Sequence, residues 1–292
     1  MKDNQDLYVR SVVKFRKELD DMEILISKCV SDVLELEDSD LHLRAYRAEW
    51  HIKGLIYHCK NILEKYTTFA EEVMIRVTAD EGRRLDILIM HSQEIQQLMY
   101  EFYALVNLSK RSLDNLSILV YPLFVNKDIP KSISDFKSGT TNCPMYERLA
   151  NDPITDYLID LRNCLVHFRT FATNDNAYVI KEGVNDDSVM DIAKDWVSPM
   201  AKAMFRYTED TKIVVNIFLP DKIFDKNGNG DKKLAKFTYD NKFNLLGYSM
   251  RFTRTVMFST LEGFSYLINS QEKFTYNKRG LGEKVMYTGF IS

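Results

Sequence analysis

The sequence predicts a mainly α-helical protein, an antiparallel helical bundle with a small β-hairpin-containing region in its C-terminal half. Apolar residues recur at steps of three to five positions along three long stretches of the N-terminal half, which is the period of an amphipathic helix. Short connections between these stretches favour antiparallel packing. Further along the chain, β-branched and aromatic residues gather in two short runs, a pattern typical of strands.

Two long helices are predicted first, over residues 7–36 and 41–77. No Pro or Gly interrupts the first one. The acidic segment 37–40 then breaks the apolar period and supplies a residue that can cap the second helix. Gly54 is a weak point of that second helix, because glycine lowers helix stability.

A third long helix is predicted to begin after Asp80, which can cap it, and to run toward Leu119. Pro122 ends it, because proline cannot continue a helix. Residues 125–151, which are rich in Pro, Gly, Ser, Thr and Asn, are predicted to form a long surface loop with one helical turn near residues 145–149.

A shorter helix is predicted over residues 153–172. Asp152 can cap it, Pro153 suits its first position, and Asp156 lies in the first turn, where a negative charge interacts favourably with the helix dipole.

Strands are predicted over residues 212–219 and 236–239, with a turn at Asp225–Asp231 between them. A last helix follows over about 245–268. The segment Asp225-x-Asn-x-Asn-Gly resembles the first half of a calcium-binding loop, but Lys236 stands where such a loop needs glutamate, so the turn is the preferred interpretation.

Charge and composition limit the function classes. The composition, 45% hydrophobic and 28% charged, is that of an ordinary globular protein. The formal net charge is -3, so any RNA-binding site has to be local.

The N-terminal residues lack the features of a secretion signal, and the apolar run 118–125 is too short to span a bilayer, so we expect a cytoplasmic protein without a membrane partner. The separated cysteines are expected to be free thiols (Cys29, Cys59, Cys143 and Cys164).

The run Arg162-Asn163-Cys164-Leu165-Val166-His167 carries the sharpest chemical signal. RNA cleavage without a metal needs a group that moves the 2′-hydroxyl proton and a cation that holds the phosphate, which suits His167 and Arg162. On a helical wheel, Asn163 and His167 share the face opposite the predicted core stripe (Leu158, Leu161, Leu165 and Phe168). Ile159 and Val166 are predicted to lie on or beside that second face, so we expect something else to cover it.

This run resembles the signature of the HEPN superfamily, an Arg, a polar residue and a His late in a helical bundle. The resemblance implies a single HEPN-like domain over 1–292. It does not explain the strand-rich region, which is interpreted as a β-containing insertion or appended module at about 176–242. It also implies a metal-independent endoribonuclease, a toxin or phage-defence effector, with no cofactor. Arg162 would bind phosphate, His167 would act as acid or base, and Asn163 would orient one of them.

A dimer follows from the same run. Arg162 and His167 are roughly 140° apart on one helix, so a single copy presents them awkwardly to one phosphate. A homodimer through the helix 153–172 would bring two pairs into one cleft. The expected partners are therefore an RNA substrate, a second copy of the chain, and an antitoxin or sensor protein.

Other patterns compete with this interpretation. Arg44 and His51, like Arg84 and His91, share the loose Arg-to-His spacing, and the Asn directly after Arg162 distinguishes the third instance. His51 and His58 with Glu49 could be imagined as metal ligands, but no close pair completes a site. Arg44, Arg47 and Lys53 could line a route for RNA phosphates, and a solvated helix face explains them equally well. The alternative function is a non-catalytic HEPN-like protein that binds a partner or a nucleotide.

Overall fold

The computed structural model describes residues 2–36, 39–79, 87–91, 93–120, 132–133, 144–167, 176–181, 202–207, 213–224 and 236–279. The chain divides into two compact units. Unit 1 comprises Met1–Arg16, Tyr57–Asn107 and Tyr157–Phe252, and unit 2 comprises Lys17–Ile56, Leu108–Asp156 and Thr253–Ser292. Most of the helices contribute residues to both units.

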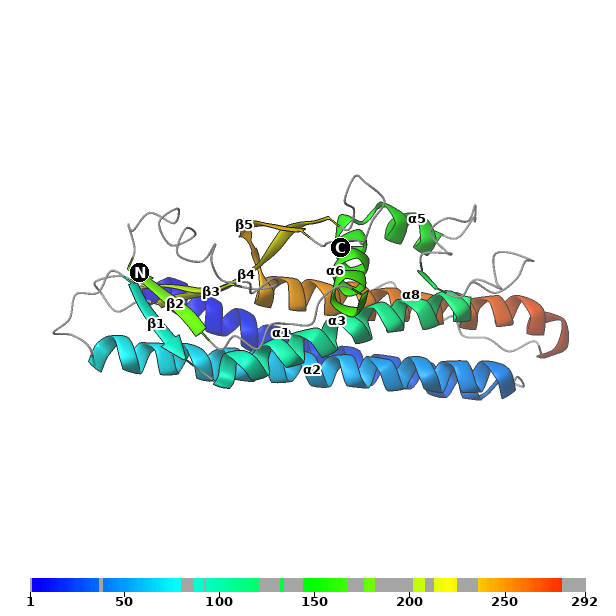
Figure 1. Ribbon diagram of the computed structural model, residues 1–292. Coiled ribbons are helices and arrows are strands. Elements are labelled where there is room, and N and C mark those ends of the chain that lie inside the picture. The colour runs from blue at the N-terminus through cyan, green and yellow to red at the C-terminus, as the bar shows by residue number, and fades with distance from the viewer. Residues whose placement is uncertain are drawn as a thin grey trace, which may run out of the picture. The chain divides into compact units, whose positions relative to one another are not determined.

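The described part of the chain is mainly helical, as the sequence predicts (Figure 1). The helices are α1 (Lys2–Leu34), α2 (Ser39–Ala79), α3 (Gln93–Val120), α5 (Pro144–Asn151), α6 (Pro153–His167) and α8 (Leu245–Arg279). The predicted helical turn near residues 145–149 lies within α5, and α8 continues beyond the predicted end at 268. No described helix is long and apolar enough to cross a membrane.

In unit 2, segments of four long helices contact one another in a closed cycle. Ser27 of α1 donates a hydrogen bond to Glu49 of α2 at 2.9 Å, and the methyl groups of Leu108 on α3 lie against Gly54 of α2. Leu116 of α3 packs against Gly263 of α8. Arg254 of α8 completes the cycle through two hydrogen bonds to Glu18 of α1, at 2.7 and 2.6 Å. The contacts make this unit a four-helix bundle.

The interior of the bundle consists of the apolar residues that gave each helix its period. Each fully buried Leu, Ile or Phe contributes roughly 1.5–3 kcal/mol relative to an exposed one. The buried residues include Leu19, Ile26 and Val33 of α1, Ala45, Ile52 and Leu55 of α2, Leu113 and Leu116 of α3, and Val256 and Phe264 of α8.

In unit 1, α2 and α3 pair in antiparallel fashion. His58 of α2 lies 2.5 Å from Glu101 of α3, and Lys65 of α2 donates a hydrogen bond to Gln97 of α3 at 2.7 Å. Residue numbers therefore rise along α2 in the direction in which they fall along α3. Aromatic rings join the other helices of this unit: Tyr157 of α6 lies with its ring centroid 5.0 Å from that of Tyr248 of α8. Burial raises the pKa of Tyr248, and the nearby Arg251 lowers it by a smaller amount.

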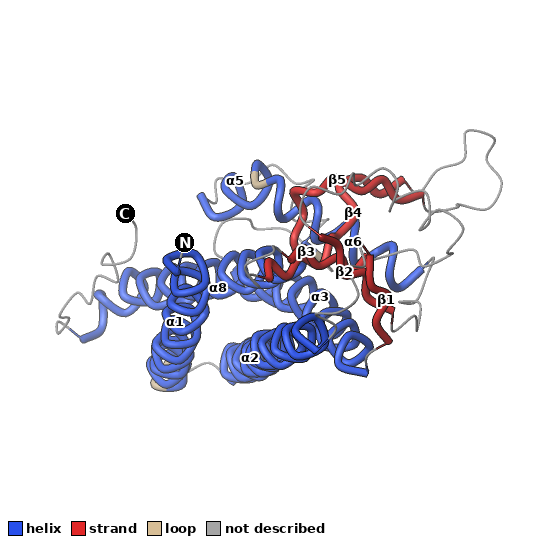
Figure 2. The backbone as a smooth tube through the Cα atoms, turned by 90° about the vertical axis from the view of Figure 1, so that its left-hand side faces the viewer, coloured by secondary structure: helices blue, strands red, loops and turns tan. Residues whose placement is uncertain are grey.

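Unit 1 also contains a sheet of five strands in the order β1-β2-β3-β4-β5 (Figure 2). The strands are β1 (Ile87–His91), β2 (Asn176–Lys181), β3 (Lys202–Tyr207), β4 (Ile213–Phe224) and β5 (Lys236–Asn244). Only β2 and β3 are parallel, and the other neighbours pair in antiparallel fashion. The register between β4 and β5 shifts on either side of Pro220, where proline cannot donate to the ladder.

This sheet differs from the sequence-based prediction in two ways, while the turn expected at Asp225–Asp231 lies outside the described residues. It is larger than the predicted small β-hairpin-containing region. Moreover β1 occupies residues 87–91, which were predicted to belong to the third helix, and it pairs with β2 from Ile87↔Ile180 to His91↔Asn176. The third helix accordingly begins at Gln93 and not after Asp80.

Candidate functional site

The helix that carries the candidate site begins as predicted. The Asp152 carboxylate accepts a hydrogen bond from the backbone N–H of Ile154 at 3.0 Å, and the Thr155 hydroxyl lies 3.4 Å from its other oxygen. A side-chain acceptor before the first turn satisfies amide groups that would otherwise lack partners. Pro153 occupies the first position of α6. Asp152 therefore fixes the register of the helix that follows.

The predicted core stripe of α6 is buried. Leu158, Leu161 and Leu165 are at most 2% exposed, while Phe168 lies outside the described residues. Ile159, which was predicted to lie on or beside the face opposite the core stripe and to be covered by something else, is 9% exposed, so other parts of the same chain cover it. Val166 is 41% exposed. Among the described side chains from Leu158 to Val166, Val166 is the one exposed apolar residue.

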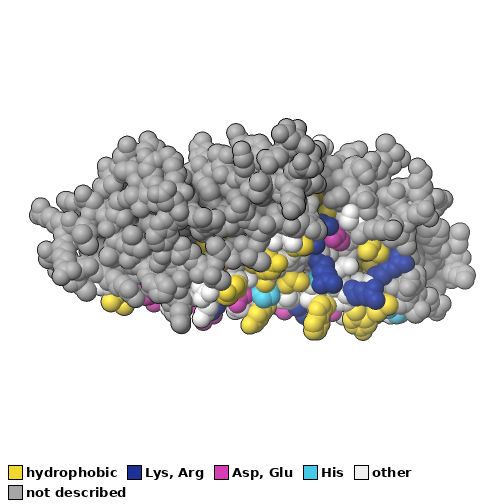
Figure 3. All heavy atoms as spheres, viewed as in Figure 1, with side chains coloured by type: hydrophobic (Ala, Val, Ile, Leu, Met, Phe, Trp, Pro, Cys, Tyr) yellow, Lys and Arg dark blue, Asp and Glu magenta, His cyan; other side chains and the backbone are white. Residues whose placement is uncertain are grey.

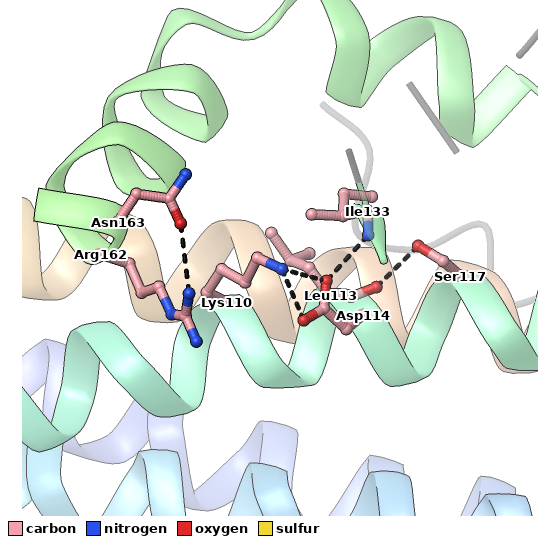
Figure 4. A network of polar contacts seen from close by, with 7 residues as sticks. All are labelled: Lys110, Leu113, Asp114, Ser117, Ile133, Arg162 and Asn163. Carbon is pink, nitrogen blue, oxygen red and sulfur yellow. Dashed lines mark hydrogen bonds and ion pairs between the residues drawn. The ribbon is translucent and has the colours of Figure 1, made fainter. Parts of the chain in front are cut away.

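Arg162 and Asn163 lie together near the end of α6. Both side chains are half-buried, and Nη1 of Arg162 donates a hydrogen bond to Oδ1 of Asn163 at 3.2 Å (Figure 4). This bond limits the rotation of the guanidinium and leaves its other N–H groups to donate elsewhere. His167 is the last residue of α6, and its side chain lies outside the described residues.

The first competing Arg-to-His pair is engaged in contacts within the helical bundle of unit 2. Nδ1 of His51 lies 2.7 Å from the Arg47 carbonyl and 2.7 Å from Nδ2 of Asn115. Burial lowers the pKa of His51, a hydrogen bond to the Arg47 carbonyl acts in the opposite direction, and the charges of Arg111 and Arg47 lower it further. Nη1 of Arg44 donates to the Ile118 carbonyl at 3.5 Å. Arg84, of the second pair, lies outside the described residues.

His58 is likewise bonded within its own unit. The two oxygens of Glu101 accept hydrogen bonds from His58 at 2.5 Å and from Asn61 at 3.1 Å. The ring of Tyr57 meets that of His58 edge to face, with the centroids 5.2 Å apart. Among the described residues, no group of three or more His, Cys, Asp or Glu side chains lies together as a metal site would require.

A partly buried ion pair on α3 was not predicted from the sequence. Nζ of Lys110 lies 2.7 Å from both carboxylate oxygens of Asp114, and Oδ1 of Asp114 also accepts the backbone N–H of Ile133 at 2.8 Å (Figure 4). The spacing of four residues on a helix is the signal that could have identified the pair. The pair attaches Ile133, which is buried, to α3, so its role is structural.

Comparisons with models of protein families, with curated proteins and with solved structures found no match to this chain.

Proposed function

We propose that the chain is a metal-independent endoribonuclease of HEPN type, acting in the cytoplasm as a toxin or phage-defence effector. The assignment covers 1–292 as one HEPN-like domain, with a β-containing insertion or appended module at about 176–242. The observation that carries the proposal is the hydrogen bond from Arg162 to Asn163 on a helix whose opposite face is buried. It supports the role of Asn163 as the residue that orients the phosphate-binding arginine.

The proposed reaction needs two kinds of group. A base removes the proton from a ribose 2′-hydroxyl, whose oxygen attacks the adjacent phosphorus while the bond from phosphorus to the 5′-oxygen breaks and an acid protonates that oxygen. His167 supplies the acid or base, because imidazole exchanges protons near neutral pH. Arg162 stabilises the charge that develops on the phosphate oxygens.

The site is proposed to be complete only in a homodimer. Arg162 and His167 are five positions apart, so their side chains leave one helix at roughly 140° to each other. A two-fold axis perpendicular to α6 would make the two copies of this helix antiparallel and would place the His167 of one copy opposite the Arg162 of the other. The exposed Val166, between the two functional positions, supplies an apolar contact for such an interface.

The test is cleavage of RNA by the purified protein in the presence of EDTA. We expect cleavage by the wild type, its loss in His167→Ala, and normal cleavage by Arg16→Ala, which removes an exposed arginine on α1. Equal cleavage by wild type and His167→Ala would contradict the proposal. So would the absence of cleavage by wild type under a range of activating conditions.

A non-catalytic interaction protein is the second candidate. The bond that Arg162 already makes to Asn163, together with the exposed Val166, also suits a face that binds an antitoxin, a sensor protein or a nucleotide. Such a protein would retain its activity in cells after His167→Ala. Calorimetric titration with nucleotides separates the nucleotide-binding version, since a complete absence of heat excludes it.

A further inference from the structure

The first half of α2 carries an exposed stripe that the proposed nuclease site does not use. Its members recur at helical spacing, so they line one face. Trp50 is 78% exposed, Tyr46 52% and Leu43 49%, although large apolar side chains are usually buried. Arg47 and Lys53 are exposed among them. We call these five residues the α2 stripe.

No exposed carboxylate interrupts the α2 stripe. Every exposed side chain between Leu41 and Ile56, a segment that the structure describes throughout, is apolar, aromatic or cationic. The acidic side chain of this segment, Glu49, is 15% exposed and bonded to Ser27 at 2.9 Å and to Lys53 at 2.8 Å. A chain with a formal net charge of -3 thus has a local cationic surface here.

The neighbouring helix α3 adds to this cationic surface. Asn115 of α3 lies 2.7 Å from His51 of α2, which brings the two helices together at this level, and the exposed Arg111 is close enough to influence that histidine. Figure 3 shows hydrophobic and basic side chains, with some acidic side chains and a histidine among them, along the lower part of the view.

The α1 segment of the same unit has a different exposed surface. Its exposed side chains between residues 17 and 36 alternate in charge and include several acids: Lys17, Asp20, Asp21, Ile24, Lys28, Ser31 and Glu35. An ordinary solvated helix face has this mixed character. The combination of aromatic rings and cations is therefore a property of α2 and not of the bundle surface in general.

We propose that the α2 stripe binds single-stranded RNA, with bases stacked on Trp50 and Tyr46 and phosphates held by Arg47, Lys53 and Arg111. Aromatic platforms beside cations bind single strands without strong sequence preference. The two rings are four residues apart, a rise of about 6 Å along the helix, so separate bases of one strand can each reach a ring. This RNA-binding proposal depends on the proposed nuclease function only for the choice of RNA as the ligand.

The same observations disfavour the other ligands of a basic helix. A double-stranded RNA keeps its bases stacked inside and offers no ring to Trp50. A membrane surface requires a wide apolar face, whereas the face opposite the α2 stripe is already buried in the bundle, and Arg47 lies between Tyr46 and Trp50. A partner helix would need a continuous apolar seam, and Leu43 is the one aliphatic member of the stripe.

The experiment uses tryptophan fluorescence. The sequence has 2 Trp, so Trp196→Phe leaves Trp50 as the one fluorescent indole. The His167→Ala substitution is added to keep the RNA intact. Titration of this full-length protein with a single-stranded oligonucleotide is expected to quench the fluorescence, and affinity is expected to fall as salt is raised.

Matched variants identify the surface. In the His167→Ala background, Trp50→Ala is expected to weaken binding of a labelled oligonucleotide by roughly 5- to 100-fold, and Trp50→Phe to restore most of it, because stacking needs a ring. Ile24→Ala, which removes an exposed apolar side chain from α1, is the control and should bind normally. The proposal would be overturned if Trp50→Ala bound the oligonucleotide as tightly as the His167→Ala parent. It would also be overturned if the parent bound duplex RNA as tightly as single-stranded RNA, or bound anionic vesicles but no RNA.

The outcome is separable from that of the nuclease proposal. Loss of binding in Trp50→Ala supports the RNA surface even if the wild type cleaves nothing. Cleavage that depends on His167, together with unchanged binding by Trp50→Ala, retains the nuclease and rejects the RNA surface.

Discussion

The end of α6 and the first half of α2 differ in how far the side chains of their proposed sites are exposed to solvent. On α6, Arg162 and Asn163 are half-buried and bonded to each other, beside a buried leucine stripe. On α2, Trp50 and Tyr46 stand mostly in solvent beside exposed cations. A catalytic group that acts on one bond is most effective when its position is fixed. A surface that binds single strands of varied sequence instead needs exposed aromatic rings and flexible charged side chains. In the two proposals, α6 carries the residues that cleave the RNA and α2 carries the residues that bind it.

Substitutions on α6 should give the largest effect. Arg162→Ala is expected to lower the rate of RNA cleavage by about 100- to 1,000-fold, the usual cost of removing a group that stabilises transition-state charge. Asn163→Ala should cost about 10-fold, because the guanidinium remains but loses the acceptor that orients it. Single-turnover rates at saturating RNA measure both. Equal losses would show that Asn163 does more than orient Arg162, and no loss in Arg162→Ala would remove that residue from the reaction.

Two glycine substitutions on α8 test its packing, Gly263→Ala in the bundle of unit 2, which holds the α2 stripe, and Gly247→Ala in unit 1. A Cβ at Gly263 would lie 2.5 Å from Cδ1 of Leu116 and 2.9 Å from Cγ2 of Val120, so Gly263→Ala should lower the free energy of unfolding by about 1–3 kcal/mol. Nothing lies within 4 Å of a Cβ at Gly247, and Gly247→Ala should raise that free energy by roughly 0.5–1 kcal/mol. Urea unfolding followed by circular dichroism measures both changes. Stabilisation by Gly263→Ala would contradict the close approach of α3 and α8.

The smallest effect concerns pH and His51, which lies beside the α2 stripe. Burial lowers the pKa of His51 in the folded state, so the unfolded state binds its proton more readily. The folded protein should lose stability as the pH falls below about 6.5, the unfolded value, and the loss should level off below the folded pKa. The fall in melting temperature between pH 7.5 and 5.5 should be smaller in His51→Gln. An identical fall in both proteins would contradict the burial of this ring.

The helical part of the fold was predictable because it depends on local period and on caps. The start of α6 followed from the capping Asp152, and the burial of Leu158, Leu161 and Leu165 followed from their spacing. The strand β1 was missed because a short apolar run such as residues 87–91 fits a helix and a strand equally well, and its partner β2 lies far away in the sequence.

The distribution of exposed surface was less predictable. A helical wheel gives the direction of Ile159 but not the neighbours that cover it, and this side chain is buried. The α2 helix carries a second set of large side chains, Leu43, Tyr46 and Trp50, at the same helical spacing as its buried set. The sequence alone does not show which of the two sets faces the bundle, so Arg44, Arg47 and Lys53 were candidates for RNA binding but the aromatic residues between them were not.

The most direct test of the composite site is a complementation experiment with two inactive variants. Arg162→Ala and His167→Ala proteins, each expected to be inactive alone, are unfolded together, refolded to form mixed dimers, and assayed for RNA cleavage in EDTA. The account predicts recovered cleavage, because an intact Arg162 from one copy then meets an intact His167 from the other. If mass spectrometry shows that mixed dimers have formed and cleavage is still absent, the composite site is contradicted.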